Sequence, residues 1–341
     1  MSFTTTPDIA AFIQSLPKTE THLHIEGALP WELLVEAFPG RYTRPPESWH
    51  DDYRFRDFTE FMDHYVHYCA EFYVSPQRYH DVARIVFARC YEQHVRYVET
   101  SFHLPVAAAI GCPGTEIVDA IRTAAPAGME VRVFTGMCHN DYDGPSRSWI
   151  DAAPEWEGLS GLDLHGPEDL PVEPWTARIW EKARAAGKRN KAHAGEFLPA
   201  GFVERILDEL QVTRIQHGNG AAEDPALVAR LAREGVTLDM CPISNLKLRA
   251  RGLQTMAAHP IRRLLDAGVR VTVSSDDPFV FGNRLSEEYY ALHRDLGFSR
   301  AELLQVVRNG WRVAQIPESE RSLRLGQLGR IAQAHGLPWQ P

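Results

Sequence analysis

Short runs of β-forming residues alternate with longer segments of helical periodicity along most of the chain. "VRYVETSFH" (95–103) and "EVRVFTGMC" (130–138) are rich in β-branched and aromatic residues, whereas "PWTARIWEKARAAGK" has apolar residues three or four positions apart and ends near a glycine. Repeated strand–helix units predict a parallel sheet. The eight predicted strands are 19–26, 95–103, 130–138, 159–166, 189–196, 213–219, 236–245 and 269–278.

Eight such units predict an α/β fold in the form of a closed (β/α)8 TIM barrel. Additional helical pattern follows the first strand over 31–92, with a loop at 38–52, and follows the eighth strand over 286–314. No linker or change in composition divides the chain, so we expect residues 1–341 to form a single domain. In such barrels the functional side chains lie at the C-terminal ends of the strands, and candidate chemistry is expected there.

Histidines and a carboxylate end three of the predicted strands. His22 and His24 are two positions apart in "THLHIEG", so both point to the same side of a strand. His193 ends the fifth strand and Asp276 ends the eighth. Three imidazoles and a carboxylate are a typical zinc donor set, and zinc lowers the pKa of bound water to about 7. The sequence therefore predicts a metal site that makes a nucleophile from water.

Three more polar residues fall at the same predicted mouth. Glu196 follows His193 by three residues and is expected to carry a proton beside the metal. His217 ends the sixth strand and is expected either to take a proton from the water or to hold it in line. Asp277 is expected to contact substrate, although "SSDDP" is also typical of a turn or a helix N-cap.

Composition and charge narrow the class of protein. The formal net charge of −9 disfavours electrostatic binding to nucleic acid or an anionic membrane. The first residues lack the basic and apolar regions of a secretory signal, and no window approaches the roughly 18 apolar residues of a membrane span. The five cysteines are widely spread, without a Cys-x-x-Cys pair. We expect a reduced, cytoplasmic protein with a small-molecule partner.

The segments "HLHIEG", "KAHAGE", "RIQHG", "CPISNLKL" and "SSDDP", in this order, resemble the adenosine deaminase family of the amidohydrolase superfamily. The resemblance implies zinc-dependent hydrolysis of a 6-aminopurine to a 6-oxopurine and ammonia, with one Zn²⁺ per chain. It also implies a role for each matching position. The zinc ligands would be His22, His24, His193 and Asp276; Glu196 would protonate ring N1, His217 would orient or deprotonate the water, Asp277 would contact N7, and the Gly166 backbone would contact N3.

The substrate side departs from the family pattern. Glu26 stands where adenosine deaminases usually have Asp, which contacts the ribose, and resembles adenine deaminases instead. Gly166 in "DLHGPE" resembles nucleoside deaminases. His24 is also expected to border the substrate. Candidates for an apolar wall, which also fit an ordinary amphipathic helix, are Phe58, Phe61, Met62 and Tyr65; the resemblance gives no role to His103, His139 or His165.

Several functions remain open at this stage. Adenosine or a related adenine nucleoside is the first expectation, and the alternatives are adenine, N6-substituted adenine and aminodeoxyfutalosine. Another amidohydrolase with one or two metals would cleave a lactone, amide or phosphoester; the absence of lysine in "DLHGPE" disfavours the usual two-metal bridge. A non-catalytic nucleoside-binding barrel should have lost a ligand or the acid, and all of these are present. The sequence does not set the oligomeric state.

Overall fold

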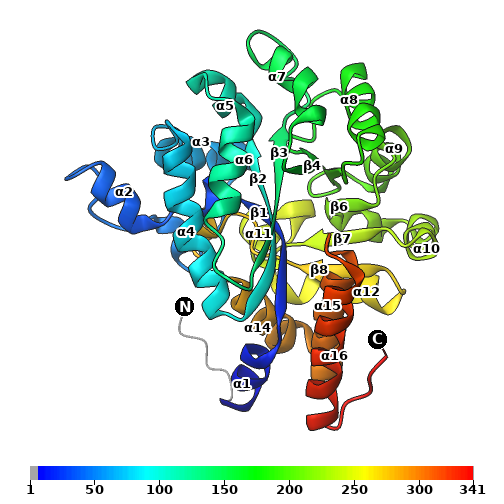
Figure 1. Ribbon diagram of the computed structural model, residues 1–341. Coiled ribbons are helices and arrows are strands. Elements are labelled where there is room, and N and C mark those ends of the chain that lie inside the picture. The colour runs from blue at the N-terminus through cyan, green and yellow to red at the C-terminus, as the bar shows by residue number, and fades with distance from the viewer. Residues whose placement is uncertain (1–6, 341) are drawn as a thin grey trace.

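The computed structural model describes residues 7–340 and contains eight parallel strands in chain order (Figure 1). The backbone N–H of Asp276 donates to the carbonyl oxygen of His22 at 3.1 Å, and that of His24 donates to Asp276 at 3.0 Å. These bonds join the two ends of the sheet, and the predicted barrel is confirmed. The strands are β1 (Lys18–His24), β2 (Val95–His103), β3 (Glu130–Met137), β4 (Leu159–Leu164), β5 (Lys191–Ala194), β6 (Arg214–His217), β7 (Thr237–Met240) and β8 (Arg270–Val273).

Helices surround the sheet, and the predicted additional helices follow β1 and β8 (Figure 1). No single helix within residues 7–340 could cross a membrane by length and hydropathy, although the bent pair Leu104–Ile110 and Gly114–Thr123 passes that test jointly. The helices are α1 (Pro7–Ser15), α2 (Trp31–Ala37), α3 (Phe58–Cys69), α4 (Pro76–Glu92), α5 (Leu104–Ile110), α6 (Gly114–Thr123), α7 (Ser146–Ala152), α8 (Pro174–Ala185), α9 (Ala200–Leu210), α10 (Pro225–Glu234), α11 (Pro242–Lys247), α12 (Ile261–Asp266), α13 (Pro278–Phe281), α14 (Leu285–Leu296), α15 (Arg300–Val313) and α16 (Glu318–Ala334).

The seventh strand is shorter than the predicted 236–245. β7 ends at Met240, and Pro242 begins α11. Proline is favoured at the first position of a helix because its missing N–H has no partner there in any case. The prediction for 241–245 was therefore wrong, and these residues form a short helix at the mouth of the barrel.

The interior of the barrel contains a buried network of charged side chains. The Lys191 ammonium pairs with Glu99, and the Arg214 guanidinium donates to Asp239 Oδ2 at 2.6 Å and to Glu99 Oε2 at 3.2 Å. Burial acts to raise the pKa of Glu99, but Arg214 and then Lys191 outweigh it and hold that pKa below its usual value. Each buried charge has an opposite partner, so the network fixes β2, β5, β6 and β7 relative to one another.

Candidate metal centre and active site

Three histidine side chains meet at the C-terminal mouth of the barrel. His22 and His24 extend from the end of β1 and His193 from β5, and their Nε2 atoms lie 3.1–3.3 Å from one another. All three residues are buried. The two β1 histidines share a face because they are alternate residues of one strand. This trio forms one candidate metal-ligand group among the described residues.

The hydrogen bonds of two of these rings leave lone pairs that face each other. His193 Nδ1 lies 2.9 Å from the carbonyl oxygen of Leu164, and His22 Nδ1 lies 3.2 Å from that of Asp239. A carbonyl only accepts, so each neutral ring has its proton on Nδ1 and an unprotonated Nε2. The facing Nε2 atoms repel unless a cation lies between them. Two nitrogens on a tetrahedral zinc ion would be about 3.3 Å apart, close to the observed spacing.

Asp276 completes the donor set from the end of β8. Its Oδ1 lies 3.2 Å from His22 Nε2 and 3.5 Å from His24 Nε2, and its Oδ2 accepts from the Ser244 hydroxyl at 2.6 Å. Burial acts to raise the pKa of this carboxyl, but the neighbouring histidines, His22 first, outweigh burial and hold that pKa well below its usual range. Asp276 has φ of +66° and His217 has φ of +64°. This left-handed backbone is uncommon outside glycine and is often found at functional sites.

Glu196 and His217 lie next to the donor set. His217 Nε2 is 3.6 Å from Glu196 Oε2 and 4.0 Å from Asp276 Oδ2. Burial, followed by the negative charges of Asp276, Glu168 and Asp277, raises the pKa of Glu196 well above its usual value. Burial also holds the pKa of His217 well below its usual value. These shifts favour the protonated form of Glu196 and the neutral form of His217.

A cavity of about 120 Å³ opens beside these groups. Gly166 borders it in a left-handed conformation, with φ of +88°, and a Cβ there would meet Cys138 Sγ at 2.5 Å. Glycine therefore allows the backbone at this position to reach the cavity. The predicted apolar wall, Phe58, Phe61, Met62 and Tyr65, also lines the cavity, as do His24, His103, Cys138, His165, Gly166, His193, Glu196, His217, Leu248, Asp276 and Asp277.

Glu26 is the one predicted substrate contact that does not line this cavity. Its Oε1 accepts from the Tyr79 hydroxyl at 2.8 Å and from the backbone N–H of His103 at 2.9 Å. Burial raises the pKa of Glu26 to about 7. Glu26 therefore holds the end of β2 through these two hydrogen bonds, and its predicted contact with substrate stays a prediction.

Comparison with known proteins identifies the family. The family model described as adenosine deaminase matches residues 17–328. The chain belongs to the adenosine deaminase family. The resemblance noted in the sequence is confirmed, and the protein is a hydrolase that deaminates purines by cleaving a C–N bond. Curated relatives named adenine deaminase include those of Rhodopseudomonas palustris, 32% identical over 97% of this chain and 98% of the relative, and Streptomyces coelicolor, 33% identical over 96% and 97%.

Solved structures resemble this deaminase over nearly the whole chain. Adenine deaminase from Arthrobacter aurescens aligns with a TM-score of 0.81 at 27% identity and covers 93% of this chain and 99% of its own. An amidohydrolase from Burkholderia ambifaria with bound zinc aligns with a TM-score of 0.81 at 23% identity, covering 98% and 97%, which shows the shared fold. Family membership and the convergent donor set together support a divalent metal in this deaminase.

Two residues of the deaminase site have structural roles that the sequence did not reveal. Glu168 accepts the backbone N–H groups of Glu196 at 2.9 Å, Phe197 at 2.9 Å and Leu198 at 2.7 Å. Asn245 donates to His217 Nδ1 at 3.1 Å. Asn245 was assigned to the predicted strand 236–245, and a carboxylate two residues after Gly166 carried no pattern. Only the position of Glu168 after the predicted strand 159–166, and of Asn245 at the end of its own, could have indicated them.

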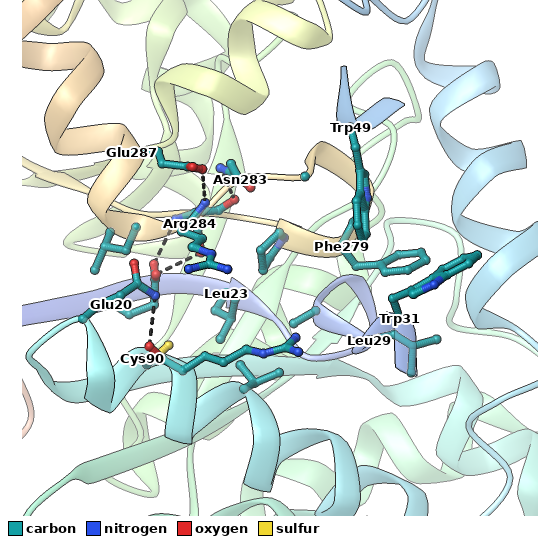
Figure 2. A pocket seen from close by; sticks show the side chains of 18 of the residues that line it. Glu20, Leu23, Leu29, Trp31, Trp49, Cys90, Phe279, Asn283, Arg284 and Glu287 are labelled. Atoms are coloured by element: carbon teal, nitrogen blue, oxygen red, sulfur yellow. Dashed lines mark hydrogen bonds between the residues drawn. The ribbon is translucent and has the colours of Figure 1, made fainter. Parts of the chain in front are cut away.

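A cavity larger than the one beside Glu196 is lined by other residues than the candidate metal donors. It has a volume of about 620 Å³, and Figure 2 shows Trp31, Trp49 and Phe279 toward one end and Glu20 and Asn283 toward the other. None of the described residues that line it belongs to the predicted metal or catalytic set. Size alone would therefore have misplaced the deaminase site.

Proposed function

We propose that this protein hydrolyses adenine to hypoxanthine and ammonia, with one Zn²⁺ per chain held by His22, His24, His193 and Asp276. Relatives that are 31–33% identical over nearly the whole chain are named adenine deaminase. The expectation of an adenosine-type nucleoside is not confirmed. The single observation that carries the choice of the free base is the cavity volume of about 120 Å³, below the roughly 300–1,000 Å³ of typical ligand pockets.

The region beside purine N9 is occupied by two side chains. If the Gly166 backbone contacts N3, the adjacent His165 lies toward N9, because N3 and N9 share the ring carbon C4. His103 Nδ1 and His165 Nε2 are 2.9 Å apart, so the two rings act as one wall. A nucleoside carries its sugar on N9 and would have to displace this pair.

Zinc, when bound, activates water for attack on C6 of the purine. Glu196 donates its proton to N1 as the water adds, so that negative charge does not accumulate on the ring. Asn245 donates to His217 Nδ1, which leaves the His217 proton on Nε2, facing Asp276 and Glu196. His217 in this tautomer holds the attacking oxygen by donating to it. The proton that the water releases on adding to C6 returns to Glu196 and passes to the 6-amino group, which leaves as ammonia. The remaining hydroxyl proton then restores the acid form of Glu196 and leaves the 6-oxo group.

Asp277 is suited to bind purine N7, which only accepts hydrogen bonds. It is 4% exposed, and its Oδ1 has no partner among the described residues. Burial, followed by the charges of Asp276 and Glu26, raises the pKa of Asp277 well above its usual value. A protonated Asp277 donates to N7, while the aromatic side chains of α3 cover the ring.

An ammonia-release screen tests this function. The panel is adenine, adenosine, deoxyadenosine, methylthioadenosine, N6-substituted adenines and aminodeoxyfutalosine, and elemental analysis gives the metal content. We expect kcat/KM for adenine to exceed that for every nucleoside by about 100-fold or more, since the sugar meets a closed wall. A nucleoside as the best substrate would contradict the proposal, and two metals per chain would favour a two-metal amidohydrolase.

The proposed role of Glu196 as the proton donor is tested separately. Glu196→Gln removes the transferable proton but keeps the shape, so we expect kcat to fall by about 100-fold or more with unchanged zinc content. Glu204→Gln, the same change at an exposed position of α9, is the matched control and should leave kcat unaltered. A Glu196→Gln enzyme within a few-fold of the wild-type rate would exclude Glu196 as the acid.

A further inference from the structure

The end of the barrel opposite the active site contains a strongly basic cavity of about 360 Å³. It is lined by the first residues of β5, β6, β7 and β8 and by the C-terminal end of α15. Seven of its lining residues are Arg or Lys and, among the described residues that line it, none is Asp or Glu. This is unexpected in a chain of net charge −9. The cationic residues are Arg184, Lys188, Arg189, Lys191, Arg214, Arg270 and Arg312.

Two of these cations are neutralised from within the barrel. Lys191 pairs with Glu99, and Arg214 pairs with Glu99 and Asp239. Both cations are more than nine-tenths buried. Their charges are therefore balanced by two carboxylates, and the four further cations considered below are Arg184, Lys188, Arg189 and Arg270.

Some of the remaining cations are held in place by neutral groups. Lys188 donates to the backbone carbonyl oxygens of Trp156 at 2.7 Å and Leu159 at 2.8 Å. Arg270 donates to the carbonyl oxygen of Gly235 at 3.2 Å. Carbonyl oxygens fix the direction of a side chain but carry no full charge to balance it. The positive potential of the cavity is consequently maintained by the fold.

Two further features of the cavity would suit an anionic ligand. Thr237 is 1% exposed, and its hydroxyl has no hydrogen-bond partner among the described residues. Such orphaned buried groups are rare in folded proteins. The pKa of Arg270 is lowered by burial and then by the positive charges of Arg312 and Arg214. An anion placed among them would relieve this repulsion.

We propose that this basic cavity binds a small compound with two or more linked phosphate groups, such as pyrophosphate, tripolyphosphate or the phosphate chain of a nucleotide. Guanidinium groups match phosphate oxygens in a two-bond geometry. Four cations, with no Asp or Glu among the described lining residues, favour several negative charges over one. The volume is within the range of small-ligand sites and larger than one phosphate needs. An adjoining hollow shares Lys188 and Arg189 and gives room for a longer chain.

Isothermal titration of the metal-loaded enzyme with sodium tripolyphosphate tests this site, with metal content measured before and after. We expect saturable one-to-one binding that sulfate at equal ionic strength does not reproduce. At 100 times the dissociation constant, the melting temperature should rise by roughly 5 °C, because the ligand binds only folded protein. Titration with ATP distinguishes an inorganic polyphosphate from a nucleotide as the ligand. Equal affinity for ATP and tripolyphosphate shows recognition of the phosphate chain alone, and tighter binding of ATP shows that the nucleoside contributes.

Two exposed arginines allow a test without disturbing the core. Arg189→Gln and Arg312→Gln should each weaken tripolyphosphate binding about tenfold or more, since each removes a charge-assisted contact. Arg122→Gln on α6 is the matched control and should bind like wild type. Adenine KM should not change, because the sites lie at opposite ends of the barrel. The proposal is overturned if tripolyphosphate does not bind or binds no better than sulfate, or if Arg122→Gln weakens binding as much as the two cavity variants do. It is also overturned if adenine competes with tripolyphosphate, or if a short RNA binds more tightly than tripolyphosphate.

Discussion

Glu168 is expected to position the catalytic acid without touching the substrate. Its carboxylate is 4% exposed and accepts three consecutive backbone N–H groups, starting with that of Glu196. These bonds fix the turn that follows β5 and so fix where the Glu196 side chain begins. Glu168→Gln is the sharpest perturbation, because it keeps the volume and removes one acceptor oxygen.

The loss of stability expected for Glu168→Gln follows from the hydrogen bonds that the Glu168 carboxylate accepts. Glu168 Oε2 accepts from Phe197 and Leu198, while Oε1 accepts from Glu196 at 2.9 Å. A glutamine whose oxygen keeps the two Oε2 bonds places its NH₂ group against the Glu196 N–H. One charge-assisted bond is lost and a buried donor is left unpaired, which costs about 2–4 kcal/mol in the free energy of unfolding. The loss falls on the residue that carries the acid, so we expect kcat to fall by about 10–100-fold.

Urea unfolding and steady-state deamination of adenine measure these two effects. Glu209→Gln, which breaks an exposed pair with Arg205 on α9, is the matched control and should cost less than about 1 kcal/mol. Zinc content should be unchanged in both variants, because Glu168 touches none of the proposed ligands. A Glu168→Gln enzyme with a wild-type unfolding midpoint and kcat would show that the turn is fixed by other contacts.

Three further outcomes are expected. Gly27→Ala places a Cβ onto the Asp277 carboxylate, so kcat/KM should fall tenfold or more by steady-state assay, whereas Gly201→Ala on α9, with open space around its Cβ, should have no effect. Burial and then Arg96 lower the pKa of Lys18 to about 7, so the unfolded chain binds the extra proton above that pH. The wild-type free energy of unfolding should therefore rise relative to Lys18→Met between about pH 7 and pH 10 by urea titration, and a constant difference would contradict this. Chelation with verified zinc loss should lower the melting temperature by roughly 5 °C or more, since the metal would tie β1, β5 and β8 together; an unchanged value would exclude that role.

The barrel and the convergence of the candidate metal donors were predictable because both depend on local pattern. Alternation of short strands with amphipathic helices sets the parallel order, and parallel order brings strand ends together. His22, His193 and Asp276 lie near or just after the C-terminal ends of β1, β5 and β8, so their convergence followed from topology. The error at 241–245 has the same origin, because an apolar run before a proline does not show where a strand ends.

The supporting residues were not predictable in the same way. Glu168 and Asn245 act through hydrogen bonds to segments more than 25 residues away along the chain, at |i−j| of 28 for both Glu168–Glu196 and Asn245–His217. No local periodicity encodes such a pairing. Glu26 shows the converse, since the family resemblance indicated a substrate contact, whereas its carboxylate accepts from Tyr79 and the His103 backbone and does not line the cavity.

The two ends of this barrel use charge in opposite ways, and the same strands connect them. β5 begins with Lys191 at the basic cavity and leads to His193 at the mouth, while β6 runs from Arg214 to His217. Lys191 and Arg214 pair with buried carboxylates near the start of these strands, and Glu196 lies beyond the other end of β5. Burial, followed by the negative charge of Asp276, raises the pKa of Glu196 well above its usual value, and this shift favours the protonated form that the proposed proton donor needs. The buried ion pairs and the shifted carboxyl are thus placed at opposite ends of the same strands.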